Sequence, residues 1–416
     1  MFLRILAIGA IWFVTSLAWI FLGSTIQFRT NSADSSLRGK VESTWGGGQE
    51  QHPPEAAYST VETKEIEETI DGKKRLRTVS HTRRHEIPLD SSRINVQVKL
   101  EPRQKGLLWY STFAYTFDAA YRFHNPTAET REVTFHLPFP SQRGIYDDVQ
   151  ILQSGKPLAT RQFGNGVATD VTLAPNAAAE LQIRFRSQGL DQWRYKFGQQ
   201  VAQVKDFQLK LKTNFTAIDF PENTLSPTAR RQIAGGWELD WNYSNLVSGS
   251  PIALTMPERI QPGPLAGEIS YFAPVSLLFF FFVIFLVTTL RGAHLHPMNY
   301  FFLAGAFFAF HLLLAYLADH IDIHTAFLIC SVVSVALVVS YLRIVTGNAF
   351  AFREAALAQL VYLILFSYAF FFKGYTGLAI TAGAILTLFV AMQATARVNW
   401  DSLFSKPAPA PPANKQ

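Results

Sequence analysis

The chain is poor in cysteine and lacks the short motifs that mark many enzymes. Cys330 is the single cysteine among 416 residues, which excludes an intrachain disulfide and a Cys-rich metal site. The sequence has no Gly-x-Ser-x-Gly elbow, no Walker loop, no His-Glu-x-x-His and no dinucleotide-binding fingerprint. We therefore expect a non-enzymatic protein without catalytic residues, cofactor or resident metal, whose folded domains are stable without covalent cross-links.

Charge is scarce in the C-terminal part of the sequence. Arg, Lys, Asp and Glu crowd between Arg29 and Arg259, whereas many of the 35 Phe residues follow Phe272. The mean hydropathy of +0.11 averages these unlike regions. This asymmetry predicts a water-exposed part and a lipid-exposed part. The formal net charge of +6 is modest, so we expect no nucleic-acid partner.

The first segment, residues 1–23, is predicted to be an uncleaved transmembrane anchor. An apolar run follows Arg4 and continues to Gly23, and it is longer than the core of about 7 to 15 residues in a signal peptide. The residues after it form no Ala-x-Ala pattern, although Gly23 and Ser24 leave cleavage open. If the helix is retained, the residues that follow it lie outside the cytoplasm.

Residues 271–400 are predicted to form a five-helix transmembrane bundle, because about 20 apolar residues span a bilayer core as a helix. The expected spans are Phe272–Leu290, Tyr300–Leu317, Ala326–Leu342, Ala355–Phe372 and Tyr375–Met392. Pro262, Gly263 and Pro264 read as the linker into this bundle. Residues 401–416 form a Pro-rich tail, which we expect to be cytoplasmic and without fixed structure.

Six spans place both termini on one side, and the loop charges indicate which side it is. One set of loops and ends carries Arg4, Arg291, Arg343, Arg353, Arg397 and Lys406, and the opposite short loops carry Lys373, Asp319 and Asp322. Basic residues are enriched in cytoplasmic loops. We therefore expect both termini in the cytoplasm and the large domain outside it, which means the periplasm if the cell has an outer membrane.

Residues 24–270 are predicted to form the large extracytoplasmic domain, an all-β, sandwich-like fold. Residues 31–68 are rich in Ser, Gly, Glu and Thr, and we expect loop or a short helix there. Beyond Lys73 the pattern is extended; Ile94, Val96, Val98 and Leu100, for example, place four apolar side chains on one strand face. Many short alternating runs separated by Gly, Pro, Asn or Ser indicate a β-sandwich.

His311 is the one strongly polar residue between Tyr300 and Leu317. Ionisable groups at bilayer depth are costly and usually face a bundle interior or a wet cavity. His311 can bridge two helices as a neutral imidazole, or it can handle protons or a ligand. Both hypotheses remain open from the sequence.

Four further candidate residues, Asp319, His320, Asp322 and His324, form the stretch Asp-His-Ile-Asp-Ile-His at the expected outer membrane edge. Carboxylate and imidazole groups suit zinc or similar ions. Their spacing matches no established zinc pattern, and the simpler interpretation is a solvated loop or a helix cap. A basic stretch from Lys73 to Arg84 can meet lipid phosphate or an acidic envelope polymer, or can be a solvated strand face.

Several segments resemble one family in order and spacing. They are LHPMNY, FHLLLAYLADHI, LVYLILFSYAFFFKGYTGL and ATARVNW between Leu295 and Trp400, with LRGKVESTWGGGQ and VKLEPRQKGLLWYSTF resembling it more loosely. The family is that of the bacterial inner-membrane protein CreD. Where its pattern often has an acidic pair before the last span, this chain has Lys373 and Gly374.

The resemblance implies a role in cell-envelope integrity, with tolerance to envelope-directed toxins and a link to stress responses. It implies no enzymatic chemistry. We therefore expect partners among membrane lipids or envelope proteins and polymers. The alternatives are a transporter or lipid-handling protein with a path near His311, and an envelope hydrolase that uses the β-domain.

Overall fold

The chain folds into two compact units in a computed structural model that describes residues 2–70, 73–198, 202–293, 295–372 and 374–396. The helical unit comprises Met1–Asp34 and Ile260–Gln416, and the β-unit comprises Ser35–Arg259. The β-unit is therefore shorter at both ends than the expected residues 24–270. The predicted tail, residues 401–416, lies outside the described residues.

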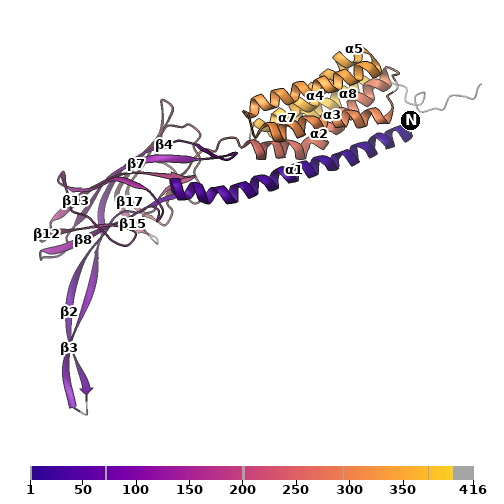
Figure 1. The fold of residues 1–416 in the computed structure, drawn as a ribbon. Helices are drawn as coiled ribbons and strands as arrows, with labels where there is room; N and C mark the ends of the chain where they lie inside the picture. Colours follow the sequence, from indigo (N-terminus) through magenta and orange to yellow (C-terminus); the bar gives the residue numbers. More distant parts are fainter. Residues whose placement is uncertain (1, 71–72, 199–201, 294, 373, 397–416) are drawn as a thin grey trace, which may run out of the picture. The chain divides into compact units, whose positions relative to one another are not determined.

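Among the described residues, six helical segments are long and apolar enough to cross a membrane. This agrees with the six predicted spans (Figure 1). Their bounds are α1 (Phe2–Trp45), α2 (Pro262–Leu290), α3 (Pro297–Leu317), α4 (Ile323–Thr346), a fifth segment over Asn348–Phe371, and α8 (Thr376–Thr395).

The fifth segment is not a uniform α-helix. It consists of α5 (Asn348–Phe350), η1 (Ala351–Ala355), α6 (Ala356–Gln359), η2 (Leu360–Leu365), α7 (Phe366–Tyr368) and η3 (Ala369–Phe371). The pieces η1 and η2 are π-helical and η3 is 3-10 helical. The π-helical turns of η1 and η2 are wider than α-helical turns, and the 3-10 turn of η3 is tighter. Both kinds of irregularity within a helix often mark functional or strained positions.

Helix α1 and the strands that follow it correct the expectation of loop or a short helix over residues 31–68. Helix α1 continues past the anchor to Trp45, because an existing helix is extended without a new nucleation step. Arg38 pairs with Glu42 one turn later, at 3.6 Å. Gly46 ends the helix with φ 83° and donates its N–H to the carbonyl of Glu42 at 2.9 Å. Strands occupy most of the rest of the expected loop.

The start of α2 corrects the expected linker at Pro262 to Pro264. Gln261 is extended and precedes the helix, and Pro262 occupies its first position. Proline is compatible with this position because the N–H it lacks would have no partner within the helix. At α3, Pro297 likewise occupies the first turn of the helix.

The β-unit contains two large sheets. In spatial order, the eight-stranded sheet consists of β10 (Lys156–Pro157), β9 (Tyr146–Gln153), β13 (Ala178–Leu190), β7 (Thr112–His124), β4 (Leu89–Leu100), β15 (Ala202–Thr213), β17 (Gly236–Ser248) and β16 (Ala229–Ile233). The five-stranded sheet consists of β11 (Arg161–Gln162), β12 (Gly166–Leu173), β8 (Arg131–Pro138), β2 (Glu55–Ile70) and β3 (Lys73–Ile87).

Two smaller sheets complete the unit. One contains β1 (Gln49–Gln51), β14 (Gln192–Tyr195) and β18 (Ile252–Thr255), and the other β5 (Arg103–Lys105) and β6 (Leu108–Tyr110). Most neighbouring strands are antiparallel, but β4 pairs with β15 and β1 with β14 in parallel. Parallel neighbours need long connections, and no local pattern in the sequence indicated them.

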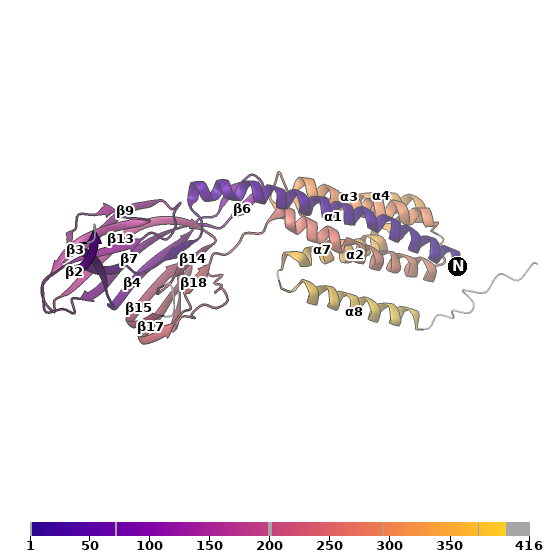
Figure 2. The ribbon, with the colours of Figure 1, turned by 90° about the horizontal axis from the view of Figure 1, so that it is seen from below.

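The two large sheets share one hydrophobic core, as expected of a β-sandwich. The predicted row on β4 faces it: Ile94, Val96 and Val98 are buried and Leu100 packs against the core. Phe123 of the eight-stranded sheet meets Phe135 of the five-stranded sheet edge to face, with ring centroids 5.2 Å apart. Figure 2 shows the strands of the β-unit in a second view.

Strands β2 and β3 form a ribbon that continues beyond its sheet (Figure 1). They pair with each other from Ala56 and Ile87 to Ile70 and Lys73, whereas β2 meets β8 only over Glu55–Ala57. Two strands alone are marginally stable in water. The exposed pair Arg83 and Glu62, at 3.5 Å, crosses this ribbon.

On β1, Glu50 forms a small cluster with two bases. Its carboxylate lies 2.8 Å from Lys196 Nζ and 3.4 Å from His52 Nε2. Burial alone would raise the pKa of Glu50, but the hydrogen bond and charge of Lys196, with a contribution from His52, hold this pKa below its ordinary value of 4.5. The charged form is therefore favoured in the folded state.

This cluster predicts an acid-dependent contribution to stability. Because folding lowers the pKa of Glu50, its stabilisation is present above the unfolded value and is lost as the pH falls through the folded value. Glu50→Gln should therefore melt below wild type at pH 7, and the difference should shrink well below pH 4.5. Thermal melting of the full-length protein in detergent, followed by tryptophan fluorescence, measures it.

Glu180→Gln is the matched control for this prediction. Glu180 is exposed on β13 and forms no ion pair with another described residue, so its variant should follow wild type at both pH values. A Glu50→Gln difference that grew on acidification would contradict the assignment.

Candidate functional site

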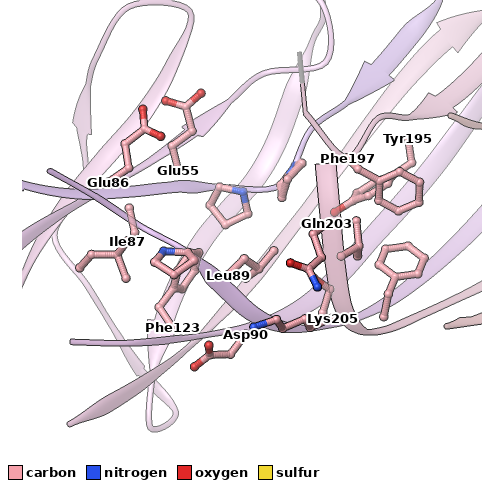
Figure 3. Close-up of a pocket in the computed structure, with 17 residues that line it drawn as sticks. Glu55, Glu86, Ile87, Leu89, Asp90, Phe123, Tyr195, Phe197, Gln203 and Lys205 are labelled. Carbon is pink, nitrogen blue, oxygen red and sulfur yellow. The ribbon is translucent and has the colours of Figure 1, made fainter. Parts of the chain in front are cut away.

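A pocket of about 620 Å³ lies at one end of the sandwich in the β-unit (Figure 3). The five-stranded sheet contributes the beginning of β2 and the end of β3, and the eight-stranded sheet contributes parts of β4, β7 and β15. The start of β2 and the end of β3 pair at Ala56 and Ile87. The pocket therefore lies where residues of the two sheets come together at the edge of the common core.

The lining of this pocket is acidic on balance. It includes the carboxylates of Glu55, Glu86 and Asp90 and one ammonium group, that of Lys205. Figure 3 shows Glu55 and Glu86 on one side of the pocket and Asp90 with Lys205 on another. The Tyr195 hydroxyl adds no charge, since a phenol is ordinarily uncharged at neutral pH and burial raises the pKa of Tyr195 further.

One buried polar atom of the lining has no hydrogen-bond partner among the described residues. Ser92 is 1% exposed, and its Oγ is buried without a hydrogen bond among the described residues. Ser92 precedes Ile94, Val96 and Val98 on the inward face of β4, so the inward row ends in a hydroxyl beside the pocket. A buried hydroxyl without a partner costs free energy that a ligand atom could recover.

His311 lies at a packed helix interface. It is 1% exposed on α3, and its Nδ1 is 3.0 Å from the carbonyl oxygen of Phe307 in the preceding turn. Trp19 of α1 meets the imidazole edge to face, with centroids 5.7 Å apart, and Phe310 lies 4.9 Å away. Its Nε2 has no partner among the described residues. This environment favours the structural interpretation of His311.

The four residues at the predicted outer edge have separate contacts. Asp319 pairs with Arg29 of α1 at 3.0 Å, and Arg29 also donates to the carbonyl of Ala315 at 3.2 Å. Asp322 caps α4 by accepting from the N–H groups of His324 and Thr325, at 3.0 and 3.3 Å.

His320 and His324 do not lie with Asp319 and Asp322 in an arrangement that could hold one metal ion. The ring of His324 lies 4.9 Å from that of Phe371, and His320 is exposed, with its backbone N–H bonded to the carbonyl of Leu317. Among the residues that the structure describes, no three His, Cys, Asp or Glu side chains converge to hold a metal ion. The cap interpretation of Asp322 is thus observed.

The sequence interpretation missed a second polar group inside the helical unit. Gln359, fully buried at the end of α6, donates to Ser334 Oγ at 2.8 Å, and Ser334 donates to the carbonyl of Ala306 at 2.8 Å. The Gln359 Oε1 has no partner within the described segments. The rule that singled out His311, a polar residue inside an apolar span, would also have found Gln359.

Strand β3 contains the basic stretch. Lys73 to Arg84 lies on β3, and Arg84 is 3.6 Å from Glu55 while Arg83 pairs with Glu62. These are exposed cross-strand pairs, which contribute little stability each. Lys373 lies outside the described residues.

The surroundings of His311 predict a mild effect of His311→Phe. Phenylalanine matches the aromatic neighbours and removes the unpartnered Nε2, so we expect wild-type protein levels, stability within about 1 kcal/mol and a wild-type envelope. His311→Ala leaves a cavity and should cost about 2 kcal/mol or more. Melting in detergent and an envelope-leakage assay measure these effects. A normally folded His311→Phe protein with a leaky envelope would support the functional hypothesis instead.

Comparison with known proteins gives one family match, within the helical unit. A family model described as "Inner membrane protein CreD" matches residues 268–401, and no curated protein matches the chain. A structure titled as a candidate nutrient binding protein from Legionella pneumophila is 11% identical, covering 47% of this chain and 71% of its own, with a TM-score of 0.34.

An M1 zinc metallopeptidase from Deinococcus radiodurans is 8% identical, with a TM-score of 0.25; the alignment covers 41% of this chain and 42% of the peptidase, less than half its length. TM-scores this low carry no inference about function. The family match covers α3, α4, the fifth segment, α8 and all but the beginning of α2. The resemblance predicted from the sequence is thus confirmed over residues 268–401, which match the CreD inner-membrane protein family.

Proposed function

We propose that this inner-membrane protein maintains the integrity of the cell envelope by binding lipid or envelope partners, without catalysis. The observation that carries the proposal is the CreD match over residues 268–401. The β-unit adds support, because its 620 Å³ pocket offers charged and aromatic groups to a ligand. The packing of Trp19 and Phe310 around His311 gives no support to a transport path there.

The proposal includes an orientation with the β-unit in the periplasm. Arg4, Arg291, Arg343 and Arg353 lie at ends of the spans that share one side, and Asp319 and Asp322 lie at the α3–α4 connection on the other. The positive-inside rule then assigns the arginines to the cytoplasm.

Site-directed labelling tests the orientation. In a Cys330→Ser background, we expect Lys156→Cys of the β-unit and His320→Cys of the α3–α4 connection to react with a membrane-impermeant maleimide in spheroplasts. Asn348→Cys should react only after permeabilisation, because it lies near the expected cytoplasmic end of its span. All three positions are exposed. The opposite labelling pattern would reverse the orientation.

Deletion of the gene tests the envelope role. We expect the deletion strain to take up more of an impermeant dye and to release more of a periplasmic enzyme under detergent or β-lactam stress. The wild-type gene should restore both readouts, at protein levels checked by immunoblot. An envelope as tight as that of the parent strain under all these stresses would refute the proposal.

A further inference from the structure

The pocket of the β-unit carries an excess of negative charge that its surroundings neutralise only in part. Glu55 lies 3.6 Å from Arg84 and 3.9 Å from His136. Glu86 forms no ion pair with any described residue. Asp90 has one weak contact, with His124 Nδ1 at 3.7 Å. Two carboxylates of the lining are therefore available to a cationic group.

An aromatic wall also belongs to the lining, in which Phe197 is half-buried and the rings of Tyr195 and Phe207 behind it are buried. The ring of Phe197 lies 5.8 Å from that of Tyr195 and 5.0 Å from that of Phe207, and Phe123 lies in the lining as well. Aromatic faces attract ammonium groups within about 6 Å of the ring centre. Figure 3 shows Tyr195 and Phe197 across the pocket from Glu55 and Glu86. A body with an apolar face and an ammonium group fits both walls.

The buried Ser92 Oγ is independent support for a ligand with a polar group. It lines the pocket and has no hydrogen-bond partner among the described residues. A hydroxyl can donate or accept, so a hydroxyl or amine of the ligand would satisfy it. The charge, the aromatic wall and this orphan atom therefore converge on one cavity.

We propose that this pocket binds an amine-bearing molecule of the cell envelope, whose ammonium group lies by one of the two available carboxylates, Glu86 or Asp90, and whose carbon body packs on the aromatic wall. The inference deepens the proposed function, on which it rests for the envelope origin of the ligand. Lys205 opposes this binding by charge, because its ammonium lines the pocket and forms no ion pair with a described residue.

A matched pair of probes tests the ammonium requirement on the full-length protein in detergent. Phenethylamine and 2-phenylethanol have the same ring and chain and differ in an ammonium against a hydroxyl group. By titration calorimetry or saturation-transfer NMR, we expect phenethylamine to bind at least about ten-fold more tightly, as loss of one good charge contact predicts. Equal affinity for the two probes, or no binding of phenethylamine, would overturn the proposal.

Three variants test the assigned residues. At least one of Glu86→Gln and Asp90→Asn should weaken phenethylamine binding several-fold, and Lys205→Gln should tighten it by removing a like charge. Glu132→Gln, exposed on β8 and absent from the pocket lining, is the control and should change nothing. Weaker binding by Lys205→Gln, or no effect of either carboxylate variant in a normally melting protein, would refute the assignment.

Competition identifies the source of the amine. Glucosamine represents amino-sugar polymers, and glycerophosphoethanolamine represents a lipid headgroup; displacement of phenethylamine by one of them assigns the ligand to that source. Displacement by neither would contradict an envelope ligand. If phenethylamine does not bind but the deletion strain has a more permeable envelope, the pocket assignment alone is refuted. If phenethylamine binds as expected but the deletion strain has an envelope as impermeable as that of its parent, the envelope role alone is refuted.

Discussion

The β-unit depends on one buried row of side chains along β7. Phe113, Tyr115, Phe117, Tyr121 and Phe123 alternate with exposed or half-buried residues, and each is 2% exposed or less. β7 pairs with β13 along its whole length and with β4 along most of it. Because the chain has one cysteine, this packing against the second sheet takes the place of cross-links in holding the sandwich together.

The same constraint explains where the pocket lies. Inside the sandwich most inward positions are filled by apolar side chains. At its end the inward row on β4 stops at Ser92, and the pairing of β4 with β7 shifts register at Asp90. Polar groups can occupy this edge because solvent or a ligand can reach them. The candidate site is thus a consequence of where the core ends.

A different constraint governs the helical unit. In a bilayer, polar groups must find partners within the protein, and Gln359 and Ser334 do so in a chain of hydrogen bonds that ends on a backbone carbonyl. His311 finds a backbone carbonyl on one side and aromatic rings on the others. These residues connect helices, and their surroundings give the unit a specific packing.

The sequence by itself determined the six spans, most strands of the sandwich and the family of residues 268–401, because hydropathy, period-two alternation and motif order are local properties. It did not determine the extension of α1 to Trp45 or the parallel pairing of β4 with β15. Only the tertiary structure brought Arg29 to Asp319, and Glu86, Asp90 and Ser92 to one pocket. Those contacts join residues far apart in the chain or on different strands, and their partners depend on how helices and sheets pack, which no local pattern records.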